Sequence, residues 1–178
     1  MKTINILAVI GGISKDSLNK RLYNESVKHN HTGLKFQTFA IETLPFFSQD
    51  TENNPPETVV AFRQAVMKSD AILFITPEYN RSFPGVLKNA IDWCTRPYGH
   101  NLWKRKPVGI IGASGGRIGT FGAQQQLKTV CNFLDMKLMN QPEVYFDASA
   151  LMDENGLTPT GASIIQNYLA ALEKWITN

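Results

Sequence analysis

Apolar residues gather along the chain in five stretches that have the length and composition of β-strands. Two of them are apolar almost throughout, which is typical of strands covered on both faces of a sheet, and another alternates apolar with polar residues. The predicted strands are Ile4–Ile10, Leu34–Ile41, Ala71–Thr76, Val108–Ala113 and one strand between Lys137 and Phe146.

The segments between these strands repeat their apolar residues at helical spacing. Pro55-Pro56 opens one of the helices, as expected for proline in a first turn. The predicted helices and their inward residues are Ser17–His29 (Leu18, Leu22, Tyr23, Val27), the helix after Pro56 (Val59, Phe62, Val66), the helix from Pro84 to about Thr95 (Leu87, Ala90, Ile91, Cys94), the helix after Gly122 (Ala123, Leu127, Val130, Cys131, Leu134) and the last helix (Ile165, Tyr168, Leu169, Leu172, Ile176).

Strand and helix alternate five times, which predicts an α/β fold with a parallel sheet, helices on both faces and right-handed crossovers. Five strands fit the flavodoxin-like doubly wound order 2-1-3-4-5 better than a six-stranded dinucleotide fold. The 178 residues, 43% of them hydrophobic, suffice for one sizeable core. We therefore expect residues 1–178 to form a single flavodoxin-like domain.

Composition narrows the function classes. The net charge of +3 is mild and the basic residues are scattered, so we do not expect a dedicated nucleic-acid binder. No apolar run could span a bilayer, and no signal-peptide cleavage site follows the first strand, so we expect a cytoplasmic protein without a membrane partner. Cys94 and Cys131 lie on apolar helix positions, which favours buried thiols over a disulfide.

The chain order of the elements also predicts where a site lies. In an open doubly wound sheet, ligands bind beyond the carboxyl ends of the strands, where the winding reverses. For the predicted order this crevice lies between the first and third strands. The loops Gly11–Asp16, Pro77–Pro84 and Ser114–Gly122 should meet there, and all three are rich in Gly, Ser, Asn or Pro.

The first loop has features of a phosphate site. Gly11-Gly12 permits close approach of the backbone, and Ser14, Ser17 and Asn19 add neutral donors at the start of a helix. An ordinary capped helix start is the alternative, with Asp16 as a possible N-cap. The loop has neither the glycine-lysine-serine ending of a nucleoside-triphosphate loop nor the G-x-G-x-x-G fingerprint.

The other two loops suit a planar heterocycle. Two prolines stiffen Pro77–Pro84, and Asn80 tolerates unusual backbone conformations, so N–H groups there could line the edge of a ring. The alternative is a rigid connection with Tyr79 and Phe83 packed inward. Four glycines in Ser114–Gly122 favour a flat backbone surface against a ligand, and the alternative is a flexible surface loop.

All three loops resemble motifs of one family, the third of them around Ser114-Gly115-Gly116. Pro77-Glu78-Tyr79-Asn80, followed by Ser82-x-Pro84-Gly85-x-Leu87-Lys88-Asn89-Ala90-Ile91-Asp92-Trp93, resembles the signature of the NADPH-dependent FMN reductases, which include bacterial chromate, quinone and azo-dye reductases. Gly11, Ser17 and Asn19 match the family's phosphate motif G-S-x-R-x-x-S-x-N, where this chain has Gly12 for the serine and Ser14 for the arginine. The resemblance runs from about Ile4 to Phe146.

The resemblance implies a noncovalently bound FMN. The phosphate would lie on the first loop and the isoalloxazine ring against the backbone of Pro77–Asn80, with the N–H groups of Tyr79 and Asn80 toward its N5 and pyrimidine edge. Lys15 would compensate in part for the missing arginine. The implied cofactor-binding residues are Gly11, Gly12, Ser14, Lys15, Ser17, Leu18, Asn19, Pro77, Glu78, Tyr79, Asn80, Ser114, Gly115 and Gly116.

With FMN bound, the flavin carries the chemistry, and no side chain need act as a nucleophile or metal ligand. NADPH or NADH would pass a hydride to the flavin, and a small-molecule acceptor such as a quinone, azo dye, chromate or free flavin would take two electrons. A flavodoxin-type electron carrier, which the net charge of +3 disfavours, and a non-enzymatic domain on the same fold are the alternatives.

The resemblance also implies a homodimer or homotetramer. Glu78 is expected to pair with a basic residue across a subunit interface. Trp93 lies off the apolar stripe of its helix, and Tyr98 and Trp103 follow in the next loop, so this region is expected to form the interface or to overhang the flavin. The alternative places Trp93 in the core.

Overall fold

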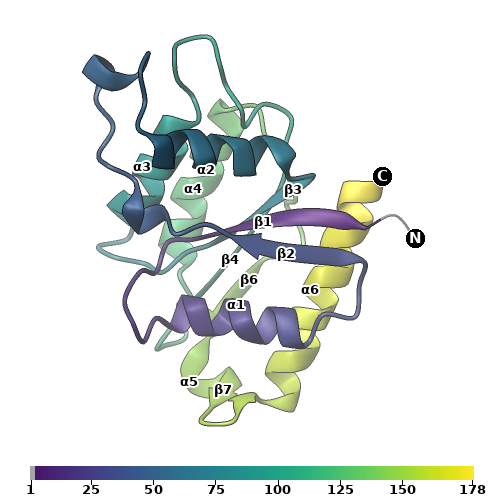
Figure 1. Cartoon of the computed structure of the whole chain (residues 1–178). Coiled ribbons are helices and arrows are strands. Elements are labelled where there is room, and N and C mark those ends of the chain that lie inside the picture. The colour runs from purple at the N-terminus through teal and green to yellow at the C-terminus, as the bar shows by residue number, and fades with distance from the viewer. Residues whose placement is uncertain (1–2) are drawn as a thin grey trace.

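The computed structural model describes residues 3–178 and shows a parallel sheet between two layers of helices (Figure 1). The strands follow the order β2-β1-β3-β4-β5, with β6 also paired to β4, and this is the predicted order 2-1-3-4-5. They are β1 (Ile4–Ile10), β2 (Leu34–Thr38), β3 (Ala71–Ile75), β4 (Pro107–Ser114), β5 (Lys137–Leu138) and β6 (Val144–Asp147).

Helices cover both faces of the sheet, as predicted. The cores show that α1 and α6 pack on one face and α2, α3 and α4 on the other (Figure 1). Among residues 3–178, no helix has the length and apolar composition of a membrane span. The helices are α1 (Leu18–Lys28), α2 (Glu57–Lys68), α3 (Gly85–Trp93), α4 (Phe121–Phe133), α5 (Ala148–Leu151), α6 (Pro159–Thr177) and the short 3-10 helices η1 (Ile41–Thr43) and η2 (Gln49–Thr51).

Three details differ from the predicted elements. The fifth strand is interrupted, since β5 pairs with the start of β4 and β6 with its end. The second strand ends at Thr38, because the chain turns there and buries Ile41 as the first residue of η1. The sequence pattern predicts no element for residues 148–157, which form α5 and the hairpin of β7 (Met152–Asp153) and β8 (Gly156–Leu157).

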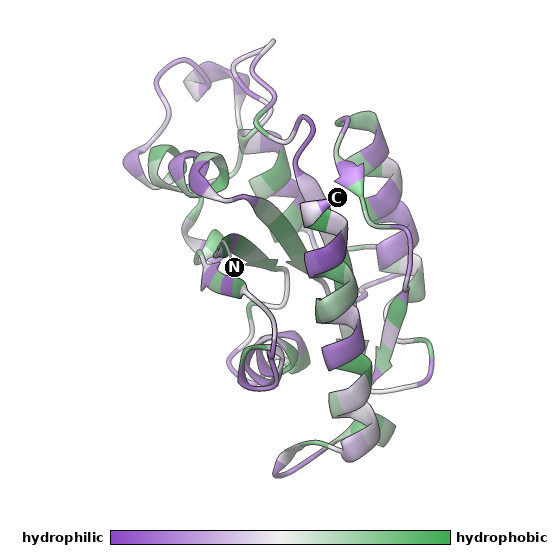
Figure 2. Ribbon diagram, turned by 90° about the vertical axis from the view of Figure 1, so that its right-hand side faces the viewer, coloured by the Kyte–Doolittle hydropathy of each residue, from purple (hydrophilic) through white to green (hydrophobic). Residues whose placement is uncertain are grey.

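Each face of the sheet has its own apolar core. Figure 2 shows hydrophobic central strands and helices banded with hydrophilic and hydrophobic residues. The predicted inward residues of α2 and α3 are all buried, whereas α1 differs: Val27 is 43% exposed and Ser26 is buried instead. Ser26 can be buried because its hydroxyl donates to the Leu22 carbonyl at 2.7 Å, which satisfies it within the helix.

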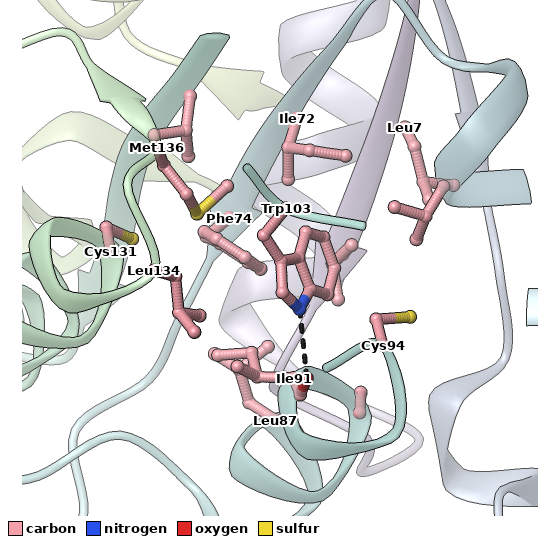
Figure 3. Packing of buried hydrophobic residues seen from close by; sticks show 14 of the residues in the cluster. Leu7, Ile72, Phe74, Leu87, Ile91, Cys94, Trp103, Cys131, Leu134 and Met136 are labelled. Carbon is pink, nitrogen blue, oxygen red and sulfur yellow. Dashed lines mark hydrogen bonds between the residues drawn. The ribbon is translucent and has the colours of Figure 1, made fainter. Parts of the chain in front are cut away.

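Two of the three aromatic residues expected at an interface or over the flavin, Trp93 and Trp103, lie in the core instead, which confirms the alternative for Trp93. Trp103 is fully buried, packs on Phe74 with ring centroids 5.8 Å apart, and donates its indole N–H to the Ile91 carbonyl at 2.9 Å (Figure 3). Trp93 donates its indole N–H to the Pro45 carbonyl at 2.8 Å. Apolar bodies with satisfied N–H groups are stable inside a protein.

Both cysteines are buried free thiols, as predicted. Burial raises the pKa of both thiols, to about 12 for Cys131. A thiol with so high a pKa is a poor nucleophile at neutral pH, so Cys94 and Cys131 are packing residues.

Candidate functional site

The three predicted loops meet at one edge of the sheet. We call them loop A (residues 11–17), loop B (77–84) and loop C (114–122). Strand β3 lies between β1 and β4, and parallel pairing of Ile10 with Ile75 and of Ile75 with Ile111 brings the carboxyl ends of the strands together. The Gly11 N–H donates to the Ile75 carbonyl at 2.8 Å, and Pro77 lies beside Gly11, so loops A and B leave the sheet in contact.

Loop A wraps around the start of α1. Ser17 is the N-cap, because its hydroxyl oxygen accepts from the N–H groups of Asn19 and Lys20 at 3.2 and 3.3 Å, so the alternative N-cap Asp16 is wrong. A Cβ on Gly12 would overlap the Ser17 hydroxyl and lie 3.2 Å from the Asn19 Cβ. Within residues 3–178, the N–H groups of residues 12–16 donate to no other group. Free donors at a helix N-terminus favour a bound phosphate.

Two lysines bring positive charge to loop A. Lys15 is exposed, and Lys20 donates from Nζ to the Ile13 carbonyl at 2.9 Å while lying 3.9 Å from a Glu42 carboxylate oxygen. Sequence reasoning missed Lys20. Its position three residues after Ser17, one turn into the helix, was the available signal.

The other residues predicted to bind the phosphate differ in how far they are exposed to solvent. Ser14 is exposed, and its carbonyl accepts from the Ser17 N–H at 3.3 Å. Leu18 packs partly against the core, so its backbone N–H is the group it can offer to a ligand. Asn19 is buried, and its side chain hydrogen bonds to the backbone of Ala113 at the end of β4.

Loop B contains a tight turn. Tyr79 and Ser82 exchange backbone hydrogen bonds of 2.9 and 3.0 Å across Asn80 and Arg81, whose φ values are 52° and 65°. Asparagine tolerates this conformation well, which confirms the expected role of Asn80. The Tyr79 N–H is therefore used within the chain and is not free to serve a ligand as predicted. The Asn80 N–H has no partner within residues 3–178.

The two aromatic residues of loop B point to different environments. The Tyr79 side chain is 56% exposed, whereas Phe83 packs against the core. The alternative with both aromatics packed inward thus applies to Phe83 alone.

Glu78 joins loop B to the start of α4. Its carboxylate accepts from the Ala123 N–H at 3.1 Å and from the Arg81 guanidinium at 3.0 Å, and the side chain is nearly buried. The positive end of the helix dipole stabilises a carboxylate at this position. Both oxygens thus have partners within the chain without a contact across a subunit interface. Sequence reasoning missed the contact with Ala123.

Loop C is open in its first half and anchored in its second. Apart from the adjacent residues in the chain, no atom of residues 3–178 lies within 4 Å of a Cβ built on Gly115 or Gly116, whereas a Cβ on Gly119 would overlap the backbone of Tyr145. The Ser114 hydroxyl donates to the Gly116 carbonyl at 2.9 Å, which braces the open half. A flat ring can therefore approach the backbone at Gly115 and Gly116. Free donors on loop A and open backbone on loop C together fit a planar cofactor that carries a phosphate.

Apart from the two lysines of loop A and Glu78 of loop B, ionisable side chains play a small part in this site. No cluster of His, Cys, Asp or Glu suited to a metal ion occurs within residues 3–178. Burial and a hydrogen bond to Glu143 raise the pKa of Tyr145, beside loop C, to about 12, so its phenol is neutral at physiological pH. Free backbone N–H groups on loops A and B and open backbone on loop C are what these loops can offer to a ligand.

Comparisons with known proteins agree with this geometry. The family model for the NADPH-dependent FMN reductases matches residues 4–150. A 2-hydroxy-1,4-benzoquinone reductase from a Burkholderia species is 41% identical over 177 residues, covering 97% of this chain and 96% of the relative, and a quinone reductase from Pseudomonas putida is 37% identical over 175 residues, covering 97% and 94%.

A solved structure agrees as well. FerB from Paracoccus denitrificans, a flavoenzyme NAD(P)H:(acceptor) oxidoreductase, superimposes with a TM-score of 0.92 at 38% identity, covering 98% of this chain and 97% of FerB. The match in sequence extends across loops A, B and C, and the match in structure extends over nearly the whole chain. The chain therefore belongs to the NADPH-dependent FMN reductase family.

Proposed function

We propose that this protein passes two electrons from NADH or NADPH to a quinone or a similar planar acceptor, with FMN as its bound cofactor. The observation that carries the proposal is the meeting of free N–H groups on loop A with the open backbone of Gly115 and Gly116 at one edge of the sheet. When bound, FMN supplies the chemistry, since it accepts a hydride and releases two electrons. The names of the Burkholderia and Pseudomonas relatives support a quinone as the acceptor.

Each loop has a task in holding FMN. Loop A binds the phosphate with backbone N–H groups, the Ser17 hydroxyl and the charges of Lys15 and Lys20. Loops B and C hold the ring between them, and the free Asn80 N–H is the donor of loop B. The residues proposed to contact FMN are Gly11, Gly12, Ser14, Lys15, Ser17 and Leu18 for the phosphate, and Pro77, Glu78, Tyr79, Asn80, Ser114, Gly115 and Gly116 for the ring.

An apolar rim surrounds this edge and supports a planar aromatic acceptor. Every loop contributes at least one exposed large apolar side chain: Ile13 from loop A, Tyr79 from loop B, and Ile118 and Phe121 from loop C. Exposed apolar side chains around one site mark a surface for an apolar ligand. Quinones and nicotinamide rings are flat and largely apolar, so the rim suits both substrates.

Anaerobic spectroscopy of the purified protein tests the proposal. The purified protein should be yellow or should take up added FMN. NADPH or NADH should then bleach the flavin absorption band. Addition of 1,4-benzoquinone should restore the band, with one quinone reduced per nicotinamide oxidised. A protein that takes up no FMN contradicts the proposal. Bound flavin that neither nicotinamide reduces indicates a flavodoxin-type carrier instead.

Ser17→Ala tests the phosphate assignment. The change should weaken FMN binding by ~1–2 kcal/mol, because a hydrogen bond to a charged group is lost. The same hydroxyl caps α1, so the free energy of unfolding should also fall by about 1 kcal/mol. Fluorescence titration of apoprotein with FMN and denaturant unfolding measure the two effects. Unchanged FMN affinity would contradict the assignment.

Residues 1–178 are proposed to act as one cytoplasmic domain. The described residues place all three loops at the edge of one sheet, so the FMN site needs no second domain. The cytoplasm is also where NADH and NADPH are available as reductants.

We propose a homodimer that forms through the surface between α3 and α4. Trp93 and Trp103 lie in the core and take no part in this interface. Tyr98 and Phe133 are 88% and 87% exposed, and both line a largely apolar groove of about 890 Å³. Its other apolar lining residues are Ile91, Val130 and Leu134, and charged side chains (Lys88, Asp92, Arg96, Lys104 and Asp135) also line it. In a twofold dimer the same patch serves both partners, so Phe133 of each subunit can fill the groove of the other.

Phe133→Glu tests this dimer. A charge in the apolar groove should convert the dimer to a monomer at micromolar concentration, as measured by sedimentation equilibrium. Phe46→Glu is the matched control, because Phe46 is equally exposed and lies outside the groove. Equal masses for the two variants would place the interface elsewhere.

A further inference from the structure

Asn19 joins loop A to loop C through two hydrogen bonds. Its side chain is 2% exposed, its amide nitrogen donates to the Ala113 carbonyl at 3.0 Å, and its amide oxygen accepts from the Ala113 N–H at 2.9 Å. We infer that Asn19 is a positioning residue that holds the FMN ring site in register with the phosphate site. The inference rests on the proposed function and replaces a direct contact between Asn19 and the phosphate.

The position of Ala113 explains why this bond matters. Strand β3 ends at Ile75, and its ladder with β4 ends with the Thr76 N–H donating to the Ile111 carbonyl at 3.0 Å. Ala113 lies two residues further along β4, beyond the end of β3 and on the side of β4 that faces β3. The carboxamide of Asn19 presents an N–H donor and a carbonyl acceptor side by side, as a neighbouring strand would, and so takes the place of a strand there.

On its other side Asn19 is packed into loop A. Its backbone N–H donates to the capping hydroxyl of Ser17, and a Cβ on Gly12 would lie 3.2 Å from the Asn19 Cβ. The next residue after Ala113 is Ser114, which begins loop C. A single side chain therefore connects the residues that bind the phosphate with the residues that border the ring.

The same bonds limit what else Asn19 can do. Its oxygen accepts the Ala113 N–H, its nitrogen donates to the Ala113 carbonyl, and the side chain is buried. Loss of the side chain leaves a buried N–H and a buried carbonyl without partners, so the end of β4 and loop C should shift. Because loop C borders the ring, this shift should weaken the binding of the ring of FMN.

Riboflavin separates the two roles, because it has the ring of FMN and lacks the phosphate. We expect Asn19→Ala apoprotein to bind FMN and riboflavin more weakly by the same factor, roughly 5- to 100-fold, measured by fluorescence titration. Weaker FMN binding with unchanged riboflavin binding would show a direct phosphate contact and overturn the inference. Unchanged binding of both flavins would overturn it as well.

Asn89→Ala is a matched control. Asn89 also makes two backbone hydrogen bonds with its amide, to the Pro45 carbonyl at 2.9 Å and from the Phe47 N–H at 2.8 Å, and it lies outside loops A, B and C. This variant should lose similar stability and keep both flavin affinities. Flavin binding that falls as much in Asn89→Ala would show a general effect of lost stability and overturn the inference.

Asn19→Asp serves where the alanine variant does not fold, since it keeps the acceptor for the Ala113 N–H. Its riboflavin affinity should fall because a carboxylate faces the Ala113 carbonyl, and unchanged riboflavin affinity would overturn the inference. Wild-type apoprotein reports on the proposed function separately. If it binds neither flavin, the proposed function fails first and the inference with it.

Discussion

Trp103→Ala is expected to lower the free energy of unfolding by ~3–5 kcal/mol, the usual cost of truncating a buried tryptophan. The indole is fully buried and packs on Phe74 at a ring-centroid distance of 5.8 Å (Figure 3). It also packs on Phe62 at 6.4 Å. Its removal also takes away one of the two donors that the Ile91 carbonyl has within residues 3–178, and the carbonyl then keeps only the Cys94 N–H at 3.2 Å. Urea unfolding of the wild type and the variant measures the difference.

Phe46→Ala is the control for this effect. Phe46 is also aromatic, is 86% exposed and lies outside the groove of the proposed dimer, so its truncation should change stability by less than about 0.5 kcal/mol. A small loss of stability for Trp103→Ala, together with a change from dimer to monomer caused by this substitution alone, would place Trp103 in a subunit interface as the sequence suggested.

The tryptophans show what a sequence pattern does not contain. Trp93 falls off the apolar stripe of its helix, and Trp103 sits in a segment without periodicity, so both resemble surface aromatics. In the structure, the segment that carries Trp103 returns beneath α3, and the chain near Pro45 accepts the Trp93 N–H. Helical periodicity shows which face of a helix packs on the sheet. Trp93 and Trp103 are instead buried by segments that are distant from them in the sequence, and periodicity contains no information about those contacts.

The position of the site was predictable for a different reason. Parallel strands share their direction, so the loops after β1, β3 and β4 must leave the same edge once the strand order is known. The order followed from counting strands, and it was right even though the fifth strand is interrupted. General rules of topology therefore carried the prediction further than the residue-level motifs did.

The contacts that connect the loops were not predictable. Asn19 and Ala113 are 94 residues apart along the chain, and Glu78 and Ala123 are 45 apart. Each pair joins a side chain to a backbone group, and a backbone group has no sequence signature. Motif matching assigned Asn19 and Glu78 to a ligand and a partner subunit, since it records only which residue types recur.

Gly12→Val is expected to weaken FMN binding by about 2–4 kcal/mol, the combined cost of overpacking and a lost helix cap. A Cβ on Gly12 would overlap the Ser17 hydroxyl and press on Asn19, so the valine must displace both. The Ser17 hydroxyl then leaves the N-cap, and the free N–H groups of loop A lose their common arrangement. Flavin content after purification and titration of the apoprotein with FMN measure the loss.

Gly85→Val separates this effect from the general cost of replacing a glycine. A Cβ on Gly85, the first residue of α3, meets no atom of residues 3–178 within 4 Å beyond its chain neighbours and the adjacent backbone of its own helix, so this variant should keep its flavin. Gly12→Val should also lose more affinity for FMN than for riboflavin, because the damage centres on the phosphate donors. The selective loss of FMN affinity in Gly12→Val contrasts with the equal loss of FMN and riboflavin affinity expected for Asn19→Ala. The two variants together therefore distinguish binding of the phosphate from positioning of the ring. Retention of FMN in Gly12→Val would show that loop A does not close around the phosphate.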